Sequence, residues 1–248
     1  MKTVLITGCS SGYGLETALY FHRQGWRVIA TMRNPREAIL PASDRIVLQA
    51  LDVTDPTSIA DCATAIGPVD VLVNNAGIGL VGAFEATPMF QIRKIFDTNT
   101  LGVMAVTQAF LPALRARGGG VIVNVTSSAT LAPSPYAGAY TASKMAIEGL
   151  SACLALELAP FDIRVKLVEP GHAPTTRFAA NADFRIEDMI PEAYEQHARP
   201  IFEAFAQPAL TTREVEVAEA VWIAAHDVTS RLQFPAGADA VALWEKAQ

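Results

Sequence analysis

The sequence contains few residues that would point to disulfides, a metal or a membrane. Its three cysteines, Cys9, Cys62 and Cys153, are odd in number and widely spaced, which suits a reduced protein better than a disulfide framework or a zinc site. The four histidines show no ligand spacing either. No run approaches the roughly 18 apolar residues of a membrane-spanning helix. We therefore expect a cytoplasmic protein with no metal and no membrane span.

Positive charge is also scarce. The chain has 19 Lys and Arg against 25 Asp and Glu, a net charge of −6 that disfavours a nucleic-acid partner. Charged residues make up only 18% of the chain and apolar residues 51%, which excludes disorder and allows a large core. No long Gly/Ser linker or repeat divides the 248 residues, so residues 1–248 are predicted to form a single domain.

Short apolar runs alternate with helical patterns along the chain. Strands are predicted over residues 4–6, 26–31, 45–51, 69–73, 121–125 and 164–168, with a last short strand near Phe234. Helices are predicted at residue 15, after Pro35, at Asp55-Pro56, after Thr87-Pro88, over 99–117 with a kink at Pro112, from Tyr140, after a capping box at Thr211–Glu214, and at the end. This alternation predicts an α/β fold, a doubly wound parallel sheet of the Rossmann type that binds ligands at the carboxyl ends of its strands.

A glycine-rich turn joins the first predicted strand to the first predicted helix. Glycines let the backbone approach a pyrophosphate, and the helix N-terminus supplies free N–H groups. The pattern is Thr-Gly-x-x-x-Gly-x-Gly, which in isolation would be an ordinary turn; its place between a strand and a helix favours dinucleotide binding. The candidate contacts are Gly8, Ser10, Ser11, Gly12, Tyr13 and Gly14.

The second predicted strand ends without the acid of an NAD site. About 20 residues beyond the glycine motif, an acid would bind the ribose 2′-hydroxyl. Thr31 occupies that neighbourhood, and Arg33 follows. Because arginine binds phosphate bidentately, the sequence predicts NADP(H) in preference to NAD, with Arg36 as a second candidate contact. The alternative is that Arg33 is a surface charge.

Tyr140 and Lys144 are four residues apart in a predicted helix. At this spacing their side chains share one face, about 5–6 Å apart. A neighbouring cation favours the phenolate and lowers the pKa of a tyrosine. Ser127 follows the preceding strand and could hold a carbonyl oxygen against the phenol. The pattern predicts a proton donor for a carbonyl compound, although the pair alone could be a chance occurrence on a solvated face.

Together these motifs resemble the short-chain dehydrogenase/reductase family. They occur in the family's order from Val4 to about Thr175: the glycine-rich turn, Asn74-Asn75-Ala76-Gly77, the segment around Asn99, Ser127 with Tyr140 and Lys144, and Pro170-Gly171 to Thr175. The Thr31-Met32-Arg33 segment, the Cys9-Ser10-Ser11 turn and a long segment before Thr211 are most similar to the branch of 17-beta-hydroxysteroid and retinol dehydrogenases.

The resemblance implies roles for individual residues. The catalytic set would be Asn99, Ser127, Tyr140 and Lys144, with Asn99 holding a water that relays protons from Lys144. Cofactor contacts would include Asp52 and Val53 at the adenine, Asn75, Ala76 and Gly77 at a ribose, Tyr140 and Lys144, and Pro170, Gly171, Ala173 and Thr175 over the nicotinamide. Residues 172–210 would form a substrate lid, whose aromatic content suggests an apolar or aromatic substrate. Candidate substrate contacts are Leu131, Tyr136, His172 and Phe178.

The predicted activity is NADP(H)-dependent interconversion of a ketone or aldehyde and an alcohol, with Tyr140 as general acid/base. The alternatives are an NAD-preferring dehydrogenase, a catalytically silent NADP-binding regulator, and a sugar-nucleotide epimerase or dehydratase. Three features depart from the family: Tyr13 replaces an aliphatic residue, His172 replaces an apolar one, and the terminal Gly-Gly segment is missing. A homodimer or homotetramer is expected through helices 99–117 and 140–158, and the missing segment leaves the tetramer contacts in doubt.

Overall fold

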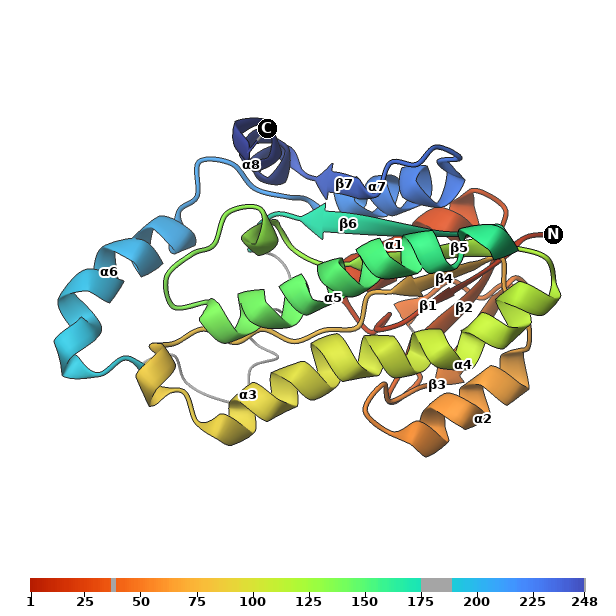
Figure 1. The fold of residues 1–248 in the computed structure, drawn as a ribbon, viewed down its shortest axis with the longest axis horizontal. Coiled ribbons are helices and arrows are strands. Elements are labelled where there is room, and N and C mark those ends of the chain that lie inside the picture. The colour runs from red at the N-terminus through yellow and green to blue at the C-terminus, as the bar shows by residue number, and fades with distance from the viewer. Residues whose placement is uncertain (37–38, 175–188, 248) are drawn as a thin grey trace.

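The computed structural model describes residues 1–36, 39–174 and 189–247. Its centre is a seven-stranded parallel sheet in the order β3-β2-β1-β4-β5-β6-β7 (Figure 1). The strands are β1 (Thr3–Ile6), β2 (Arg27–Met32), β3 (Ile46–Ala50), β4 (Val71–Asn74), β5 (Gly120–Val125), β6 (Ile163–Pro170) and β7 (Gln233–Ala236). Each predicted strand is present within one or two residues, and the predicted doubly wound sheet is confirmed.

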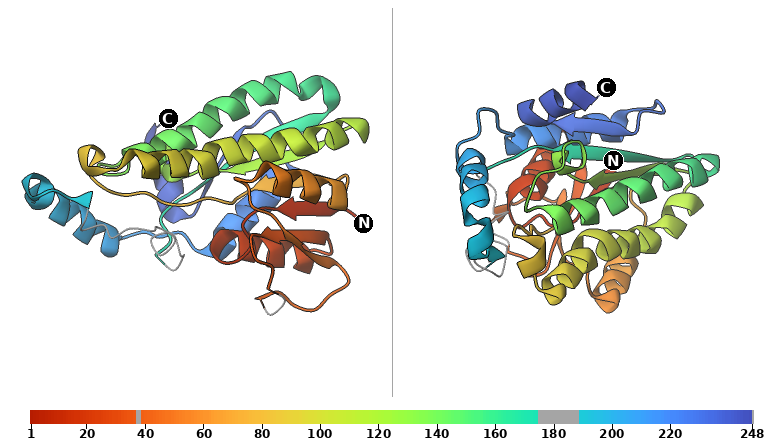
Figure 2. Two further views of the ribbon diagram at one scale, coloured as in Figure 1. Left: turned by 90° about the horizontal axis from the view of Figure 1, so that it is seen from below. Right: turned by 60° about the vertical axis from the view of Figure 1, so that its left-hand side comes forward.

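Helices cover both faces of the sheet, as the two views of Figure 2 show. On one face α1 (Gly12–Arg23) and α7 (Glu214–His226) pack on Val4 and Ile6 of β1. On the other face α2 (Pro56–Ile66), α4 (Gly102–Ala116) and α5 (Gly138–Glu157) pack on Leu5. Successive strand residues point to opposite faces, so three adjacent apolar residues of β1 supply two separate cores.

The direction of winding reverses beside β1. This strand pairs with β2 on one side and with β4 on the other, although β4 lies far along the chain. Ligands of doubly wound sheets bind in the crevice outside the carboxyl ends of strands at such a reversal. The glycine-rich turn follows β1 here, and Asn75 follows β4. The topology thus places the two motifs at one point.

The carboxyl edge is flanked by α3 (Met89–Phe96), α6 (Glu192–Ala206) and α8 (Ala238–Ala247). Figure 1 shows α6 projecting at the end of the molecule away from the N-terminus. In the described part of the chain, no helix has both the length and the apolar character needed to cross a membrane. No cluster of three or more His, Cys, Asp or Glu side chains suited to a metal occurs among those residues either.

The helix predicted after Pro35 was wrong. No α-helix occurs between β2 and β3 in the described residues, which exclude 37–38, and Leu40 is buried. Pro41 explains the difference, because a proline disfavours helical backbone at the residue before it. The interval between the two prolines is too short for a stable helix.

The capping box predicted at Thr211–Glu214 was also wrong. The N-cap of α7 is Arg213, whose backbone N–H donates to the Glu216 carboxylate at 2.8 Å. The hydroxyl of Thr212 is instead buried against the Ala236 carbonyl and the Asp239 carboxylate. Because Thr212 bonds to a distant segment of the chain, the helix begins two residues later than the sequence pattern suggested.

The helix predicted over residues 99–117 begins differently. A π-helical turn, Asp97–Leu101, joins α3 to α4, and Pro112 lies inside α4. Turns of this kind are rare and frequently occur at functional sites. Asn99 lies in this turn and is fully buried.

Candidate active site

The glycine-rich turn is fixed by close backbone packing. Gly8 and Gly12 have φ angles of +76° and +56°, a backbone region that residues with a side chain rarely adopt. A Cβ atom on Gly14 would collide with the Gly8 carbonyl and would lie 2.5 Å from the amide nitrogen of Asn75. Gly14 is therefore required by the approach of α1 to β1 and β4, and Gly8 and Gly12 by their backbone conformation.

Hydrogen bonds join the turn to the end of β4. The Thr7 hydroxyl accepts from the backbone N–H groups of Asn75 and Ala76, both at 2.9 Å. In return the Asn75 side-chain amide donates to the Thr7 carbonyl at 2.8 Å and to the Gly8 carbonyl at 3.3 Å. The small residues at 76 and 77 then leave the end of β4 open toward the pocket.

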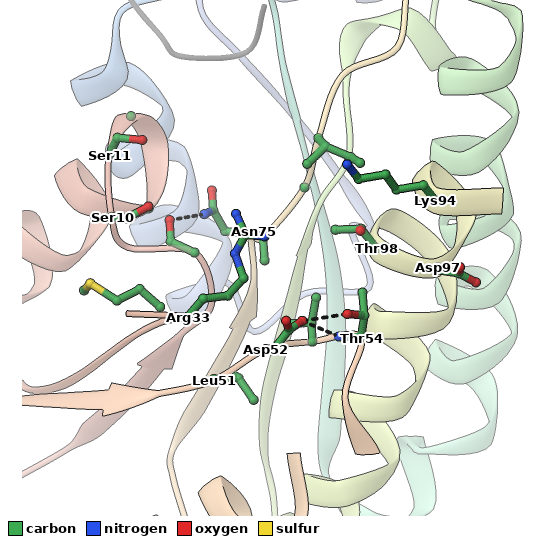
Figure 3. Close-up of a pocket in the computed structure, with 18 of the residues that line it drawn as sticks. Ser10, Ser11, Arg33, Leu51, Asp52, Thr54, Asn75, Lys94, Asp97 and Thr98 are labelled. Carbon is green, nitrogen blue, oxygen red and sulfur yellow. Dashed lines mark hydrogen bonds between the residues drawn. The ribbon is translucent and has the colours of Figure 1, made fainter. Parts of the chain in front are cut away.

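A pocket of about 600 Å³ opens between this turn and α3 (Figure 3). The side chain of the α1 N-cap, Ser11, accepts no hydrogen bond from the N-terminal N–H groups of that helix, and no acid lies in its first turn. This helix end suits an anion. The pocket is lined by most of the predicted adenosine, ribose and phosphate contacts: Gly8, Ser10, Ser11, Gly12, Tyr13, Gly14, Arg33, Asp52, Val53, Asn75, Ala76 and Gly77. Arg36, the second candidate phosphate contact, is not among its lining residues. These residues fit a dinucleotide.

The residues at the ends of β2 and β3 line the same pocket. Arg33 projects into it with Ser10 on one side and Asp52 on the other (Figure 3). The Asp52 carboxylate accepts from the backbone N–H and hydroxyl of Thr54, at 2.9 and 2.7 Å. Burial alone would raise the pKa of Asp52, but these bonds and the Arg33 charge hold it below its ordinary value. Asp52 is thus an oriented, ionised acceptor.

Tyr140 and Ser127 come together at the carboxyl end of β5. Ser127 caps a short 3₁₀ turn, and its hydroxyl accepts from the Ala129 N–H at 3.2 Å. Tyr140 lies in the first turn of α5. Burial raises the pKa of Tyr140 to about 12, and a hydrogen bond with Ser127 opposes that rise. The predicted pair of hydroxyls is therefore assembled.

The expected lowering of the Tyr140 pKa by Lys144 is not found in this structure. Lys144 is itself buried, which lowers the pKa of its ammonium to about 8. Its Nζ donates to the Val125 carbonyl at 3.0 Å. The i,i+4 spacing predicted the shared face, but it took no account of desolvation, which acts on both groups and makes the phenol a weaker acid.

Asn99 is fixed beside Lys144. Its amide donates to the Ile78 carbonyl at 2.9 Å and to the Ser143 hydroxyl at 3.2 Å, and its oxygen accepts from the Ile78 N–H at 2.9 Å. A Cβ atom on Gly77 would lie 3.2 Å from the Asn99 oxygen and 3.3 Å from the Lys144 Nζ. The amide of Asn99, from the π turn, and the ammonium of Lys144, from α5, thus both lie close to Gly77.

The segment predicted to cover a nicotinamide lies at the end of β6. Pro170 is the last residue of that strand, and the Tyr13 hydroxyl donates to the Gly171 carbonyl at 3.1 Å. This bond ties the segment to the glycine-rich turn and gives Tyr13, the unusual residue in the motif, a definite contact. Ala173 is buried nearby. The predicted contact Thr175 lies outside the described residues.

Aromatic side chains of α6 contact two of the predicted substrate residues. The Tyr136 ring lies 5.6 Å from Phe202 and 6.4 Å from Tyr194 between ring centroids, and Tyr136 has a φ of +65°. The His172 ring lies 4.7 Å from Phe205. Part of the aromatic content of the predicted lid therefore packs on neighbouring loops.

The other predicted substrate residues are less informative. Leu131 ends the 3₁₀ turn after Ser127 and is half-buried, and Phe178 lies outside the described residues.

The sequence interpretation missed Thr54 and Ile78, which orient Asp52 and Asn99. The Asp-x-Thr pattern at residue 52 could have indicated the first, since such side chains bond locally. No signal in the sequence indicates the second.

Comparison with protein families gives a match to the family described as short chain dehydrogenase over residues 2–185. The chain belongs to this family. An uncharacterised oxidoreductase of Bacillus subtilis, YusZ, is 39% identical over 212 residues, covering 81% of this chain and 75% of that protein. Retinol dehydrogenase 8 of Bos taurus is 41% identical over 186 residues, which cover 70% of this short chain dehydrogenase and 60% of the bovine protein.

Solved structures resemble the fold over nearly the whole chain. A short-chain dehydrogenase from Streptomyces avermitilis has a TM-score of 0.84 at 35% identity, covering 99% of this chain and 91% of that one. A serine dehydrogenase complexed with NADP+ has a TM-score of 0.77 at 26% identity, covering 94% of each chain. This short chain dehydrogenase is thus an oxidoreductase with structural relatives that bind a nicotinamide cofactor. It spans about 60% of the length of bovine retinol dehydrogenase 8.

Proposed function

We propose that this protein is an NADP(H)-dependent oxidoreductase that interconverts a ketone or aldehyde and an alcohol. The observation that carries the proposal is the hydrogen-bonded pair of Ser127 and Tyr140, with buried Lys144 one helical turn away. Two hydroxyls held together can bind one carbonyl oxygen, one to position it and one to protonate it. The pocket next to this group supplies a site for the dinucleotide.

The cofactor, when bound, supplies or accepts the hydride. During reduction Ser127 holds the substrate oxygen while the Tyr140 hydroxyl gives its proton to the alkoxide that forms there. A raised pKa supports this direction, because it keeps Tyr140 protonated at neutral pH. Lys144 orients the reacting end of the cofactor through its ammonium, and Asn99 fixes the adjoining backbone at Ile78. We expect Asn99 also to hold the water that returns a proton to this group.

Arg33 supports a preference for NADP(H). We expect Arg33→Ala to weaken NADPH binding by about 10- to 100-fold and to leave NADH binding nearly unchanged, because a guanidinium–phosphate hydrogen bond contributes about 1.5–3 kcal/mol. Titration calorimetry with both cofactors measures this. Arg115→Ala removes the same charge from the far end of α4 and should bind both cofactors normally. Equal weakening for NADPH and NADH would contradict a 2′-phosphate contact.

An apolar or aromatic substrate is supported by the aromatic rings of α6, where Phe202 contacts Tyr136 and Phe205 contacts His172. The decisive assay follows the nicotinamide absorbance with NADPH or NADH against aryl ketones, steroids, retinoids, aliphatic aldehydes and acyl thioesters. Turnover with NADPH on apolar carbonyls is the expected result. Tight NADPH binding without turnover on any compound would favour a silent regulator instead.

We also propose that two copies associate through α4 and α5. Leu101, Met145 and Leu156 are exposed by 54%, 41% and 80%, which is unusual for large apolar side chains along neighbouring helices. Leu156→Glu should therefore convert a dimer to a monomer in light scattering. A monomeric wild-type protein would contradict this assembly.

A further inference from the structure

The segment at the end of β6 is held at four consecutive backbone groups. The Gly171 N–H donates to the Ala236 carbonyl at 3.1 Å, and the Gly171 carbonyl accepts from the Tyr13 hydroxyl. The His172 N–H donates to the Asp239 carboxylate at 2.6 Å, and the His172 carbonyl accepts from the Thr212 N–H at 2.8 Å. Tyr13, Thr212, Ala236 and Asp239 therefore fix two residues, whereas connecting segments are usually more mobile than the elements they join.

Asp239 is the charged member of this group. It lies in the first turn of α8, and its two oxygens have separate partners: one accepts from the His172 N–H and the other from the Thr212 hydroxyl at 2.5 Å. Hydrogen bonds to an ionised acceptor are roughly twice as strong as neutral ones. The carboxylate therefore restrains His172 more tightly than a neutral acceptor would.

Packing reinforces the restraint. A Cβ atom on Gly171 would collide with both carboxylate oxygens of Asp239, so the carboxylate lies directly against the Cα atom of that glycine. The Thr212 hydroxyl, which is buried, also donates toward the Ala236 carbonyl. The backbone at Gly171 can therefore move only if the first turn of α8 moves with it.

The restrained backbone lies beside the candidate catalytic group. Tyr13, which bonds Gly171, lines the dinucleotide pocket, and its hydroxyl is close enough to Tyr140 and Asp239 for both to affect its ionisation. The His172 side chain joins this backbone to α6, because its ring contacts Phe205 of that helix. One carboxylate thus connects the last helix of the chain to the pocket and to α6.

We propose that Asp239 is a positioning residue that holds the Gly171–His172 backbone at the nicotinamide end of the cofactor site. It acts through the backbone and touches neither substrate nor cofactor. This inference depends on the proposed function, since it assumes a bound dinucleotide. It assigns a role in the site to α8, a helix beyond residues 2–185, the part that matches the family.

The test compares two ligands on the full chain. NADPH would occupy both the adenosine end and the nicotinamide end of the site. 2′,5′-ADP has no nicotinamide and would occupy the adenosine end alone. We expect Asp239→Ala to weaken NADPH binding and to lower kcat, each by about 10-fold or more, with the affinity for 2′,5′-ADP and the KM for the carbonyl compound unchanged. Asp239→Asn keeps a neutral acceptor for the His172 N–H and should restore part of both losses. Glu245→Ala, which removes a charge from the other end of α8, should match the wild type.

Wild-type NADPH affinity and kcat in Asp239→Ala would overturn the proposal. Equal weakening of NADPH and 2′,5′-ADP would also overturn it, because a general loss of structure affects both ends of the site. If Asp239→Ala does not fold, Thr212→Val removes the hydroxyl that holds the Asp239 carboxylate and should give the same ligand-selective loss, in smaller degree. A wild-type protein that binds neither ligand refutes the proposed function itself, which distinguishes that failure from an unaffected Asp239→Ala variant.

Discussion

Replacing Tyr140 with phenylalanine should lower kcat by about 10²- to 10⁴-fold, the usual contribution of a positioned general acid. The substitution removes one hydroxyl and keeps the ring in the first turn of α5. No other hydroxyl of the candidate catalytic group is as acidic. The Ser127 hydroxyl is a much weaker acid than a phenol, and the Lys144 ammonium bonds to the Val125 carbonyl. Steady-state kinetics with NADPH and the best carbonyl substrate measure the loss.

Cofactor binding should survive this change. The dinucleotide pocket is lined by the ends of β1 to β4 and by α3, and Tyr140 is not among its lining residues. We therefore expect Tyr140→Phe to keep its NADPH affinity in calorimetry. Tyr20→Phe, which changes a tyrosine of α1, is the matched control and should retain full activity. A Tyr140→Phe variant that turns over like the wild type would rule out this residue as the proton donor.

Replacing Glu169 with glutamine should stabilise the protein by about 3 kcal/mol above neutral pH. Glu169 is fully buried at the end of β6, and Gln233 donates to one of its oxygens at 2.7 Å. The other oxygen is buried without a hydrogen-bond partner among the described residues. Burial raises the pKa of this carboxyl from 4.5 to about 7, and each pKa unit corresponds to about 1.4 kcal/mol.

The sign of the effect follows from proton binding. Between about pH 4.5 and 7 the folded protein keeps a proton on Glu169 that the unfolded chain has lost, so stability falls as pH rises through this window and then levels off. Glutamine is neutral throughout and removes this contribution. Denaturant unfolding at pH 5 and pH 8 should show similar stabilities at the lower pH and a clear advantage for the variant at the higher pH. Glu157→Gln, at the exposed end of α5, should change neither value, and a Glu169→Gln curve parallel to the wild type would contradict the prediction.

The sequence predicted the sheet well because strand signals depend on local composition. The runs around Leu5 and Val123 are short, β-branched and bounded by turn residues, and each became a buried strand. The helix starts were less predictable where a side chain bonds to a distant partner. Thr211 had the local pattern of a helix cap, but the hydroxyl of its neighbour Thr212 bonds to Asp239, which lies 27 residues away, and the helix begins later. No local pattern contains that information.

In the candidate site, too, local patterns were predicted and features that depend on the whole fold were not. Spacing placed Tyr140 and Lys144 on one face, and the order of motifs placed Ser127 beside them. The sign of the Tyr140 pKa shift could not be predicted, because it depends on how completely the fold removes water from both groups. The π-helical turn at Asn99 could not be predicted from the sequence either. It has i→i+5 hydrogen bonds in place of i→i+4 bonds, within a continuous helical pattern.

The hydrogen bonds between Thr7 and Asn75 imply an order in which a newly made chain completes its pocket. These two residues are 68 positions apart, so the first βαβ unit can form while its phosphate turn still lacks the neighbour that shapes it. Contacts of such long range form late and slowly, because a large loop must close before they stabilise the fold. A nascent chain that ends before β4 would therefore already contain the glycine motif and still be unable to hold a dinucleotide.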